Sequence, residues 1–285
     1  MIKLAVVGDP IEHSLSPLVH GGAMDFIGAE YAYEKVQVKK GELPDFLSYA
    51  KEKGMNGFNL TMPHKVDILE YLDEIDDEAR FFSSVNTVKI MDGQLLGFNT
   101  DAMGYVMALK SKGYSFQNSR VVILGAGGVV RTLALKAARL GATDIRICNR
   151  TVEKAEEIAR LVNARTGVSV SAEEFSLERI VNAGKTCDIL INATPLGMHG
   201  VERDFEDLSF LEVLPKTTLV SDLIYNPAKT KLLEKAERLG LTTLNGLGML
   251  IYQGILADEI YLAQTLEKEK IYEAVSKKIN DEVGL

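Results

Sequence analysis

The sequence predicts an α/β protein with two domains, and three observations support this prediction. The chain has 285 residues, whereas one domain usually takes about 100–200. Short runs rich in Val and Ile alternate with amphipathic stretches, which is typical of parallel sheets covered by helices. A polar, turn-like segment at 115–119 is followed by a fresh start of the pattern. We therefore predict one domain over 1–104, completed by 248–285, and a second over 105–247.

Capping and turn signals place the elements of the first domain. Ser16 and Pro17 offer a capping hydroxyl and a first-turn proline for a helix, and Gly28 and Gly54 end helices. Asp92 followed directly by glycine is a strong sequence signal for a β-hairpin. The predicted elements are strand 2–8, a helix from 16 to 28, strand 32–38, helix 42–53, strand 56–60, a helix starting after Pro63, strands 85–90 and 94–98, and helix 102–112.

The second domain repeats one strand–helix unit several times. The predicted elements are strand 120–124, a glycine-rich turn at 125–128, helix 128–140, strand 144–148, helix 152–164, strands 187–191 and 218–223, and helix 228–239. The final segment, 247–283, is predicted to form two helices separated near Leu266. These helices have no strand of their own to cover, so we expect them to pack on the first domain.

Composition and charge exclude several classes of protein. Hydrophobic residues make up 46% and charged residues 25% of the chain, as in ordinary globular proteins. The net charge of −8 disfavours nucleic acid and acidic membrane surfaces as partners. No apolar run is long enough for a membrane helix, and the N-terminal apolar run reads as a strand rather than a secretory signal. We expect a cytoplasmic protein.

Cysteine and histidine usage gives no sign of a metal site. The two cysteines, Cys148 and Cys187, each lie in an apolar, strand-like run, which favours buried structural thiols. The four histidines are scattered without the spacing of zinc ligands. We therefore expect no metal, and we expect all four histidines to be structural or on the surface.

A glycine-rich turn opens the second domain and is typical of dinucleotide sites. Gly125 allows a tight turn after the strand, and Gly127 lets a pyrophosphate approach the backbone at a helix N-terminus. Val130 stands where a third Gly or Ala would pack the helix closely on the strand. The strand before, the helix after and the next strand strengthen the motif. The predicted cofactor residues of this turn are Gly125, Ala126, Gly127, Gly128 and Val129.

The residues after the second strand of this domain favour NADP over NAD. An NAD site carries Asp or Glu there to bind the ribose 2′-hydroxyl. This chain has Asn149, Arg150 and Thr151, with Lys154 one helical turn later. Two cations and a hydroxyl suit a 2′-phosphate. The alternative is that both cations are solvated and that Thr151 only caps a helix.

Four polar clusters in the first domain are candidates for a substrate site. Ser14 and Ser16 place two hydroxyls near a helix N-terminus, where an anion is favoured. Lys65 falls in the first turn of a helix, against the preference of the helix dipole, and a lysine can exchange protons. Asn86 stands in a strand that it does not favour, and Asp101 precedes a helix. Each has a structural alternative: Ser16 and Asp101 as caps, and Lys65 as a solvated charge.

Together these segments resemble the shikimate dehydrogenase family. The matching segments run in the family's order over nearly the whole chain: Gly8–Pro17, Asn59–Lys65, Val85–Thr87, Asn99–Asp101, Gly125–Gly128, Asn149–Thr151, Asn192–Met198, Asp222–Pro227 and Asn245–Gly254. The resemblance implies a substrate domain and a Rossmann domain that face a cleft, and the reversible, NADPH-dependent reduction of 3-dehydroshikimate to shikimate in aromatic amino-acid biosynthesis. It implies a small-molecule partner and a monomer or homodimer.

The resemblance also assigns roles to individual residues. It implies Lys65 and Asp101 as the catalytic pair and Ser14, Ser16 and Tyr225 as ligands of the substrate carboxylate. The substrate hydroxyls are expected on Thr61, Asn86 and Gln253. Further cofactor contacts are expected from Thr194, Leu223, Gly246 and Met249. Ala102 departs from the glycine that usually follows the catalytic Asp, which affects backbone freedom there.

Three other functions fit parts of the sequence. A quinate/shikimate dehydrogenase shares the catalytic pair but often carries an acidic residue after the second Rossmann strand and uses NAD. A non-catalytic NADP-binding module would keep the glycine turn and could lose Lys65 or Asp101, both of which are present. A folate or glutamyl-tRNA reductase relative is disfavoured by the segments around Ser14 and Asp101.

Overall fold

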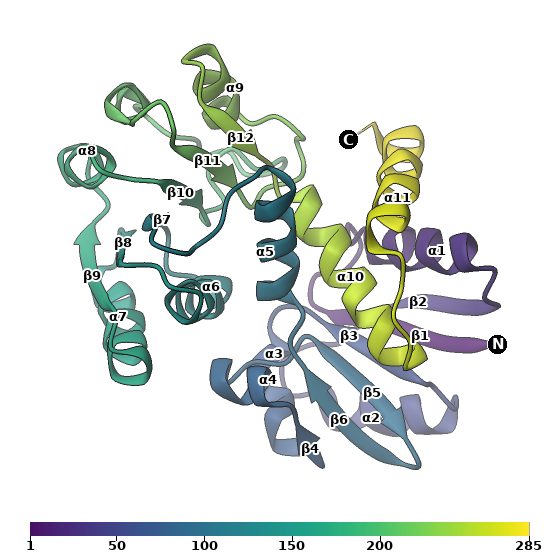
Figure 1. Cartoon of the computed structure of the whole chain (residues 1–285). Coiled ribbons are helices and arrows are strands. Elements are labelled where there is room, and N and C mark those ends of the chain that lie inside the picture. The colour runs from purple at the N-terminus through teal and green to yellow at the C-terminus, as the bar shows by residue number, and fades with distance from the viewer. Residues whose placement is uncertain (285) are drawn as a thin grey trace. The chain divides into compact units, whose positions relative to one another are not determined.

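The computed structural model describes residues 1–284, so Leu285, the last residue of the predicted segment 248–285, lies outside the described residues. The chain folds into two compact units, each with a six-stranded sheet. The first contains Met1–Gly104 and Leu250–Gly284, and the second contains Tyr105–Met249. Figure 1 shows the helices and strands of both units. The predicted α/β class is confirmed.

The sheet of the first unit is mixed. Its strands are β1 (Ile2–Gly8), β2 (Tyr31–Gln37), β3 (Gly57–Leu60), β4 (Glu74–Ile75), β5 (Thr87–Met91) and β6 (Gln94–Phe98), in the order β2-β1-β3-β5-β6-β4. The strands β2 and β3 run parallel to β1, whereas β5 is antiparallel to both β3 and β6. The C-terminal end of β3 therefore meets the start of β5 and the end of β6 at one edge of the sheet.

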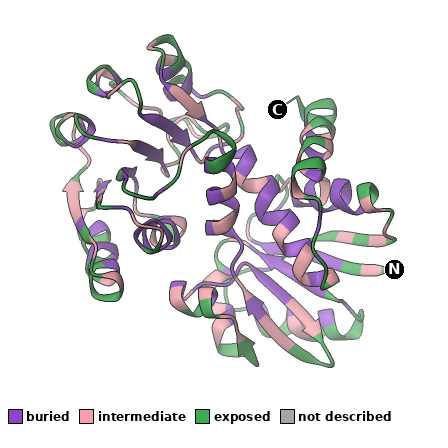
Figure 2. Ribbon diagram, in the orientation of Figure 1, coloured by how far each residue is buried: buried purple, intermediate pink, exposed green. Residues whose placement is uncertain are grey.

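Alternating side chains of β1 face two separate layers of helices. Ala5 and Val7 pack with the residues of α2, whereas Leu4 packs with those of α1 and α10, as the period of two in a strand requires. Purple buried strands lie between these layers in Figure 2. The helices are α1 (Ser16–Ile27), α2 (Leu43–Glu52), α3 (His64–Asp67), the 3₁₀ helix η1 (Ile68–Tyr71), α4 (Asp77–Phe82), the start of α5 (Asp101–Ser111), most of α10 (Leu247–Leu262) and α11 (Lys268–Val283).

Small residues allow the C-terminal helices to approach α1 closely. A Cβ atom added at Gly22 would lie 3.0 Å from Val275 on α11, and one added at Gly254 would lie 2.4 Å from Val19. The helices α10 and α11 thus complete the apolar layer of the first unit.

The sheet of the second unit is fully parallel. Its strands are β7 (Arg120–Leu124), β8 (Asp144–Asn149), β9 (Ser169–Glu174), β10 (Ile189–Asn192), β11 (Leu219–Asp222) and β12 (Thr242–Leu244), in the order β12-β11-β10-β7-β8-β9. The first strand of the unit lies in the middle, between β10 and β8. This is the doubly wound order, in which dinucleotides bind at the carboxyl ends of the central strands. The helices are α6 (Gly128–Arg139), α7 (Val152–Thr166), α8 (Leu177–Gly184), η2 (Ser209–Val213) and α9 (Lys231–Arg238).

Several predicted bounds differ from the structure for local reasons. The predicted strand 85–90 begins at Thr87, because the Val85 N–H donates to the carbonyl of Lys65 rather than to a strand. The predicted helix 228–239 begins at Lys231, because Thr230 is its cap and accepts a hydrogen bond from Leu233 N. The sequence did not predict β4, α4, β9, α8, η2 and β12, because these elements are short or carry few apolar residues.

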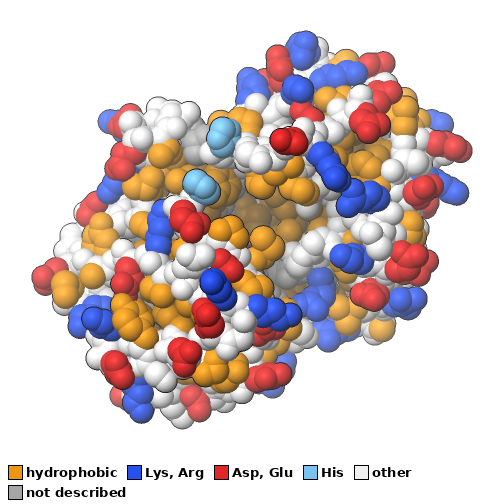
Figure 3. Space-filling model, turned by 180° about the vertical axis from the view of Figure 1, so that it is seen from behind, with side chains coloured by type: hydrophobic (Ala, Val, Ile, Leu, Met, Phe, Trp, Pro, Cys, Tyr) orange, Lys and Arg blue, Asp and Glu red, His pale blue; other side chains and the backbone are white. Residues whose placement is uncertain are grey.

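The two cysteines are buried, as predicted from the sequence, and charged residues lie over the surface. Cys148 and Cys187 are buried, and burial raises the pKa of each thiol to about 12, so both are unreactive at neutral pH. Figure 3 shows Lys and Arg side chains interspersed with Asp and Glu over the face that it presents. Within residues 1–284, no helix combines the length and apolar character needed to cross a membrane.

Candidate functional site

A lysine–aspartate pair lies at the sheet edge of the first unit where β3, β5 and β6 meet. Lys65 Nζ lies 2.6 Å from Asp101 Oδ2. Lys65 stands on α3 just beyond β3, and Asp101 begins α5 just beyond β6. The side chain of Lys65 is 30% exposed and that of Asp101 is 11% exposed. The pair is therefore accessible to a small molecule, and its geometry does not fit the alternative of a solvated lysine.

Asn86 connects the Lys65–Asp101 pair to its surroundings. Its Nδ2 lies 2.9 Å from Asp101 Oδ1, 2.9 Å from Thr100 Oγ1 and 3.3 Å from Gln253 Oε1. Its Oδ1 accepts from Thr100 N at 2.9 Å and from Thr87 Oγ1 at 3.0 Å. Since Asn86 is only 2% exposed, these hydrogen bonds fix the Asp101 carboxylate and bring Gln253 of α10 beside it.

The network continues through two residues that sequence reasoning did not place in the site. Asn59 Nδ2 donates to Thr87 Oγ1 at 3.3 Å. Tyr33 on β2 donates its hydroxyl hydrogen to Asn59 Oδ1 at 2.9 Å. The motif that includes Asn59 was noticed in the sequence, but nothing in the sequence alone points to a tyrosine on a neighbouring strand as its partner.

The two predicted serines stand together, but Ser16 does not cap its helix. Leu15 occupies the cap position of α1 without a side-chain cap bond, and Ser16 is the first helical residue. Ser14 Oγ donates to Ser16 Oγ at 3.1 Å and accepts from Ser16 N at 3.3 Å, so the two hydroxyls stand together at the start of the helix. The expected capping role of Ser16 is wrong.

Thr61 is placed by the close approach of β1 and the turn after β3. Its N–H donates to the carbonyl of Val7 at 2.9 Å. A Cβ atom at Gly8 would lie 2.3 Å from Thr61 Cγ2, so only glycine leaves room for the threonine here. The parallel strands β1 and β3 end at the same edge of the sheet. The serine segment after β1 and Thr61 after β3 therefore lie at the edge where α3, with Lys65, begins.

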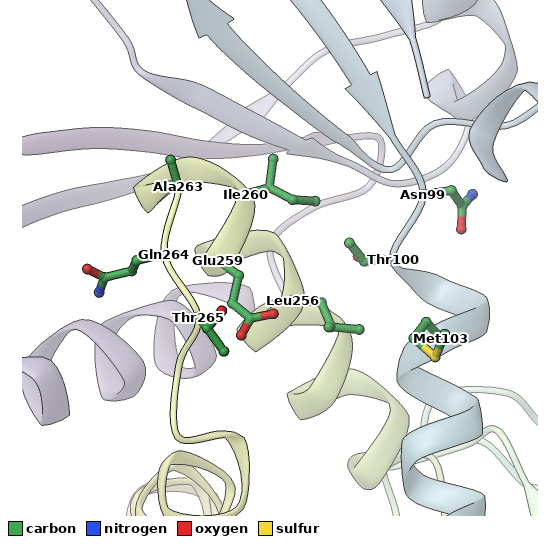
Figure 4. Close-up of a pocket in the computed structure, with 9 residues that line it drawn as sticks. All are labelled: Asn99, Thr100, Met103, Leu256, Glu259, Ile260, Ala263, Gln264 and Thr265. Carbon is green, nitrogen blue, oxygen red and sulfur yellow. The ribbon is translucent and has the colours of Figure 1, made fainter. Parts of the chain in front are cut away.

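A hollow of about 430 Å³ borders this cluster, and neither Lys65 nor Asp101 lines it. Figure 4 shows its walls: α10 and the segment after it on one side, and Asn99, Thr100 and Met103 around the start of α5 on the other. Thr100 links the hollow to Asn86 through its hydroxyl. Glu259 on α10 is engaged by Lys268 and by the N–H of Leu266.

Two of the four histidines are buried, as expected of structural residues. His64 Nε2 lies 2.6 Å from the carbonyl oxygen of Val38, which anchors the helix that carries Lys65. His20 Nδ1 lies 2.6 Å from Asp258 Oδ1, and neither residue is exposed. Burial raises the pKa of Asp258, and the neighbouring His20 opposes that effect. Sequence reasoning missed Asp258, a fully buried carboxylate within the apolar helix α10.

The glycine turn of the second unit has open space at the start of α6. Gly125 has φ of +108°, and an added Cβ would lie 2.9 Å from the carbonyl oxygen of Ala193, so this position requires glycine. Added Cβ atoms at Gly127 and Gly128 would meet nothing within 4 Å. The backbone at the start of α6 thus borders open space, which suits a pyrophosphate. Val130 is fully buried, so the core accommodates it at the third position of the motif.

The segment after β8 presents its cations freely. Arg150, Thr151 and Lys154 are exposed, and neither cation forms an ion pair within the part of the chain that the structure describes. Thr151 is the N-cap residue of α7 but makes no side-chain cap bond, so the capping alternative does not use its hydroxyl. Asn149 Nδ2 donates to the Thr151 carbonyl at 2.7 Å and fixes the turn.

Of the remaining predicted cofactor residues, Thr194, Leu223 and Gly246 lie on loops after β10, β11 and β12, and Met249 lies in the first turn of α10. Thr194 donates its hydroxyl hydrogen to Asn192 Oδ1 at 2.6 Å. A Cβ atom at Gly246 would lie 2.0 Å from the carbonyl oxygen of Leu223. Burial raises the pKa of Tyr225, which is half-buried. Met249 is half-buried and closes the second unit.

The two units therefore carry complementary chemistry. The first holds a Lys–Asp ion pair beside hydroxyl and amide groups, and the second holds an open helix start beside two exposed cations. Among residues 1–284, no cluster of three or more His, Cys, Asp or Glu side chains is arranged to hold a metal ion.

Comparison with known families places both units. Residues 6–88 match the family model described as the shikimate dehydrogenase substrate binding domain. Residues 107–204 match the family model described as shikimate / quinate 5-dehydrogenase. The shikimate dehydrogenase (NADP⁺) of Alkaliphilus metalliredigens is 41% identical over 276 residues, which cover 96% of each chain.

Solved structures of similar fold include enzymes with different substrates. A shikimate dehydrogenase in complex with NADP⁺ has a TM-score of 0.87 and 38% identity, covering 98% of this chain and 96% of that one. A 5-ketofructose reductase from Gluconobacter sp. strain CHM43 has a TM-score of 0.84 and 36% identity, covering 97% and 98%.

Proposed function

Because this chain belongs to the shikimate dehydrogenase family, we propose that it catalyses the reversible NADP-dependent interconversion of shikimate and 3-dehydroshikimate, a step of aromatic amino-acid biosynthesis. The observation that carries the proposal is the Lys65–Asp101 pair, 2.6 Å apart and held by Asn86. Such a pair can exchange a proton with the oxygen of a carbonyl or an alcohol. A binding protein without catalysis has no need of it.

The residues of the second unit fit NADP. The open backbone at Gly127 and Gly128 suits the pyrophosphate, and Arg150, Thr151 and Lys154 supply charge and a hydroxyl for the 2′-phosphate. A carboxylate, which would favour NAD, is absent from positions 149–151. When bound, the nicotinamide of NADPH supplies the hydride for the ketone.

Lys65 and Asp101 manage the proton that accompanies this hydride. In the reduction direction, Lys65 Nζ donates a hydrogen bond or a proton to the oxygen on which negative charge develops. General acid help of this kind contributes about 10²–10⁴ in rate. Asp101 orients the ammonium group and balances its charge, and Asn86 prevents the carboxylate from rotating away.

The other polar groups of the site are assigned to substrate recognition. The paired hydroxyls of Ser14 and Ser16 suit the substrate carboxylate, with Tyr225 as a third ligand. Thr61, Asn86 and Gln253 have polar groups that suit the ring hydroxyls. Under this proposal the first unit is the substrate domain and the second is the cofactor domain.

The proposal includes a cytoplasmic location and either a monomer or a homodimer. Size-exclusion chromatography with light scattering distinguishes the two oligomeric states. Quinate with NAD is the nearest rival reaction, and the free cations after β8 speak for the phosphorylated cofactor instead.

The proposal is tested by Lys65→Met. We expect kcat for shikimate oxidation to fall by about 10²–10⁴, with the dissociation constant for NADP⁺ unchanged, because Lys65 lies outside the unit that holds the glycine turn. Lys268→Met is the matched control, since Lys268 also pairs with a carboxylate in the first unit. Turnover of Lys65→Met close to that of the control would contradict the assignment.

A further inference from the structure

A buried carboxylate outside the catalytic pair connects the loops that carry the proposed cofactor contacts. Asp222 ends β11 and is not exposed. Its Oδ1 accepts hydrogen bonds from Asn192 Nδ2 at 3.0 Å and from Ile224 N at 3.1 Å. Its Oδ2 accepts one from Thr230 Oγ1 at 2.7 Å. One side chain thereby joins the end of β10, the turn after β11 and the start of α9.

Two of these partners, Asn192 and Ile224, lead to residues of the proposed cofactor site. Asn192 uses its Oδ1 to accept from both the N–H and the hydroxyl of Thr194, at 3.0 and 2.6 Å. The carbonyl of Ile224 accepts from Gly246 N at 3.0 Å. Leu223 and Tyr225 flank Ile224 in the chain. All these groups belong to the second unit, so the network holds within that unit by itself.

We propose that Asp222 is a positioning residue, which in its ionised form holds the Thr194 loop and the Leu223–Tyr225 turn ready for NADP and substrate. This inference rests on the proposed function for the identity of the ligand. A neutral side chain of the same shape offers fewer acceptors, because all three groups around the carboxylate donate. Ionised Asp222 accepts from all three donors, whereas a proton on Oδ2 requires the Thr230 hydroxyl to turn its hydrogen away and accept instead.

Burial brings the titration of this carboxylate into an accessible pH range. Burial raises the pKa of Asp222 to about 6, against the opposing effect of the three hydrogen bonds. Asp204, in the loop after β10, is the charged residue that acts on it. Asp204 is itself paired with Lys231 of α9 at 3.1 Å. No cation contacts Asp222 among the hydrogen bonds and ion pairs of the described chain.

The sign of this pKa shift separates positioning from unfolding. The pKa of Asp222 is higher in the folded protein than the usual value of 3.8. Between about pH 6 and pH 4 the folded state therefore binds the proton first, and protonation of Asp222 favours folding. A loss of cofactor affinity near pH 6 that arises from this group must occur without a loss of folded protein.

The test compares NADP⁺ binding by wild type and Asp222→Asn across pH, by calorimetry. The asparagine imitates the protonated side chain. We expect the dissociation constant of Asp222→Asn to be about tenfold that of wild type at pH 8, because one hydrogen bond to a charged group is lost. At pH 5 we expect this ratio to approach one. Titration of the cofactor phosphate affects both proteins and cancels in the ratio. A ratio that does not vary with pH overturns the inference.

A second pair of variants serves if Asp222→Asn does not fold. Thr230→Ser keeps the hydroxyl donor, and Thr230→Val removes it. Without this donor the ionised carboxylate is less favoured, so we expect Thr230→Val to move the midpoint of the pH dependence of NADP⁺ binding upward and Thr230→Ser to leave it in place. Equal midpoints overturn the inference. Because binding is measured, wild type that binds NADP⁺ without oxidising shikimate defeats the proposed reaction alone.

Discussion

Individual side chains divide the work of the two units. Asn86 shows how one amide can serve as both donor and acceptor: it fixes Asp101 with its Nδ2 and the N–H of Thr100 with its Oδ1. By contrast, the charged side chains of Arg150 and Lys154 in the second unit are exposed to solvent. A pair of side chains held in place by hydrogen bonds suits proton transfer. Exposed cations suit binding of the phosphate of an incoming cofactor.

Arg150→Ala tests the cofactor preference. We expect the dissociation constant for NADP⁺ to rise by about tenfold or more, and that for NAD⁺ to change little, since a lost charge-assisted hydrogen bond to phosphate costs about 1.5–3 kcal/mol. Arg160→Ala is the control, because Arg160 is an exposed arginine on α7 whose ion pair with Glu156 is local. Equal weakening of both cofactors would show that Arg150 does not bind the 2′-phosphate.

Elements create the sites by bringing strand ends together. The polar residues of the first unit follow β1 and β3, precede β5 and follow β6, which all meet at one sheet edge. Those of the second unit follow β7, β8, β10, β11 and β12 in a parallel sheet. Loops at such edges can vary in sequence while the sheet fixes their starting points.

Gly127→Ala separates backbone approach from folding. An added Cβ meets nothing within 4 Å, and φ of −77° at this N-cap suits alanine. We therefore expect an unchanged melting temperature and a dissociation constant for NADP⁺ raised by about tenfold, or about 1.4 kcal/mol, because the methyl group occupies the space of the pyrophosphate. NADP⁺ affinity equal to that of wild type would contradict this placement of the cofactor.

The long apolar elements could be predicted from the sequence, and the polar or short ones could not. Strand β7 and the helix after Gly128 were predicted within a residue of their bounds, because apolar runs and glycine turns are local signals. Strand β9, with the sequence Ser-Val-Ser-Ala-Glu-Glu, was not, since an edge strand needs few apolar residues. The bond from the Thr230 hydroxyl to Asp222 joins α9 to the end of β11, and no local pattern indicates it.

For the molecule as a whole, the order of the motifs along the chain indicated the family more strongly than any single motif did. The catalytic pair joins residues 36 positions apart, which no local pattern indicates, and only the resemblance linked Lys65 to Asp101 in advance. The supporting contacts, Tyr33 to Asn59 and Asp222 to Asn192, became visible in three dimensions because they join separate strands.

One assay of the purified protein tests the proposed reaction and its cofactor together. Shikimate and quinate are each offered with NADP⁺ and with NAD⁺, and 5-ketofructose with NADPH, while the absorbance of reduced nicotinamide is followed. The account predicts turnover of shikimate with NADP⁺ at a kcat/KM well above that of every other combination. Preferred turnover of quinate with NAD⁺ or of 5-ketofructose, or NADP⁺ binding without any turnover, would contradict it.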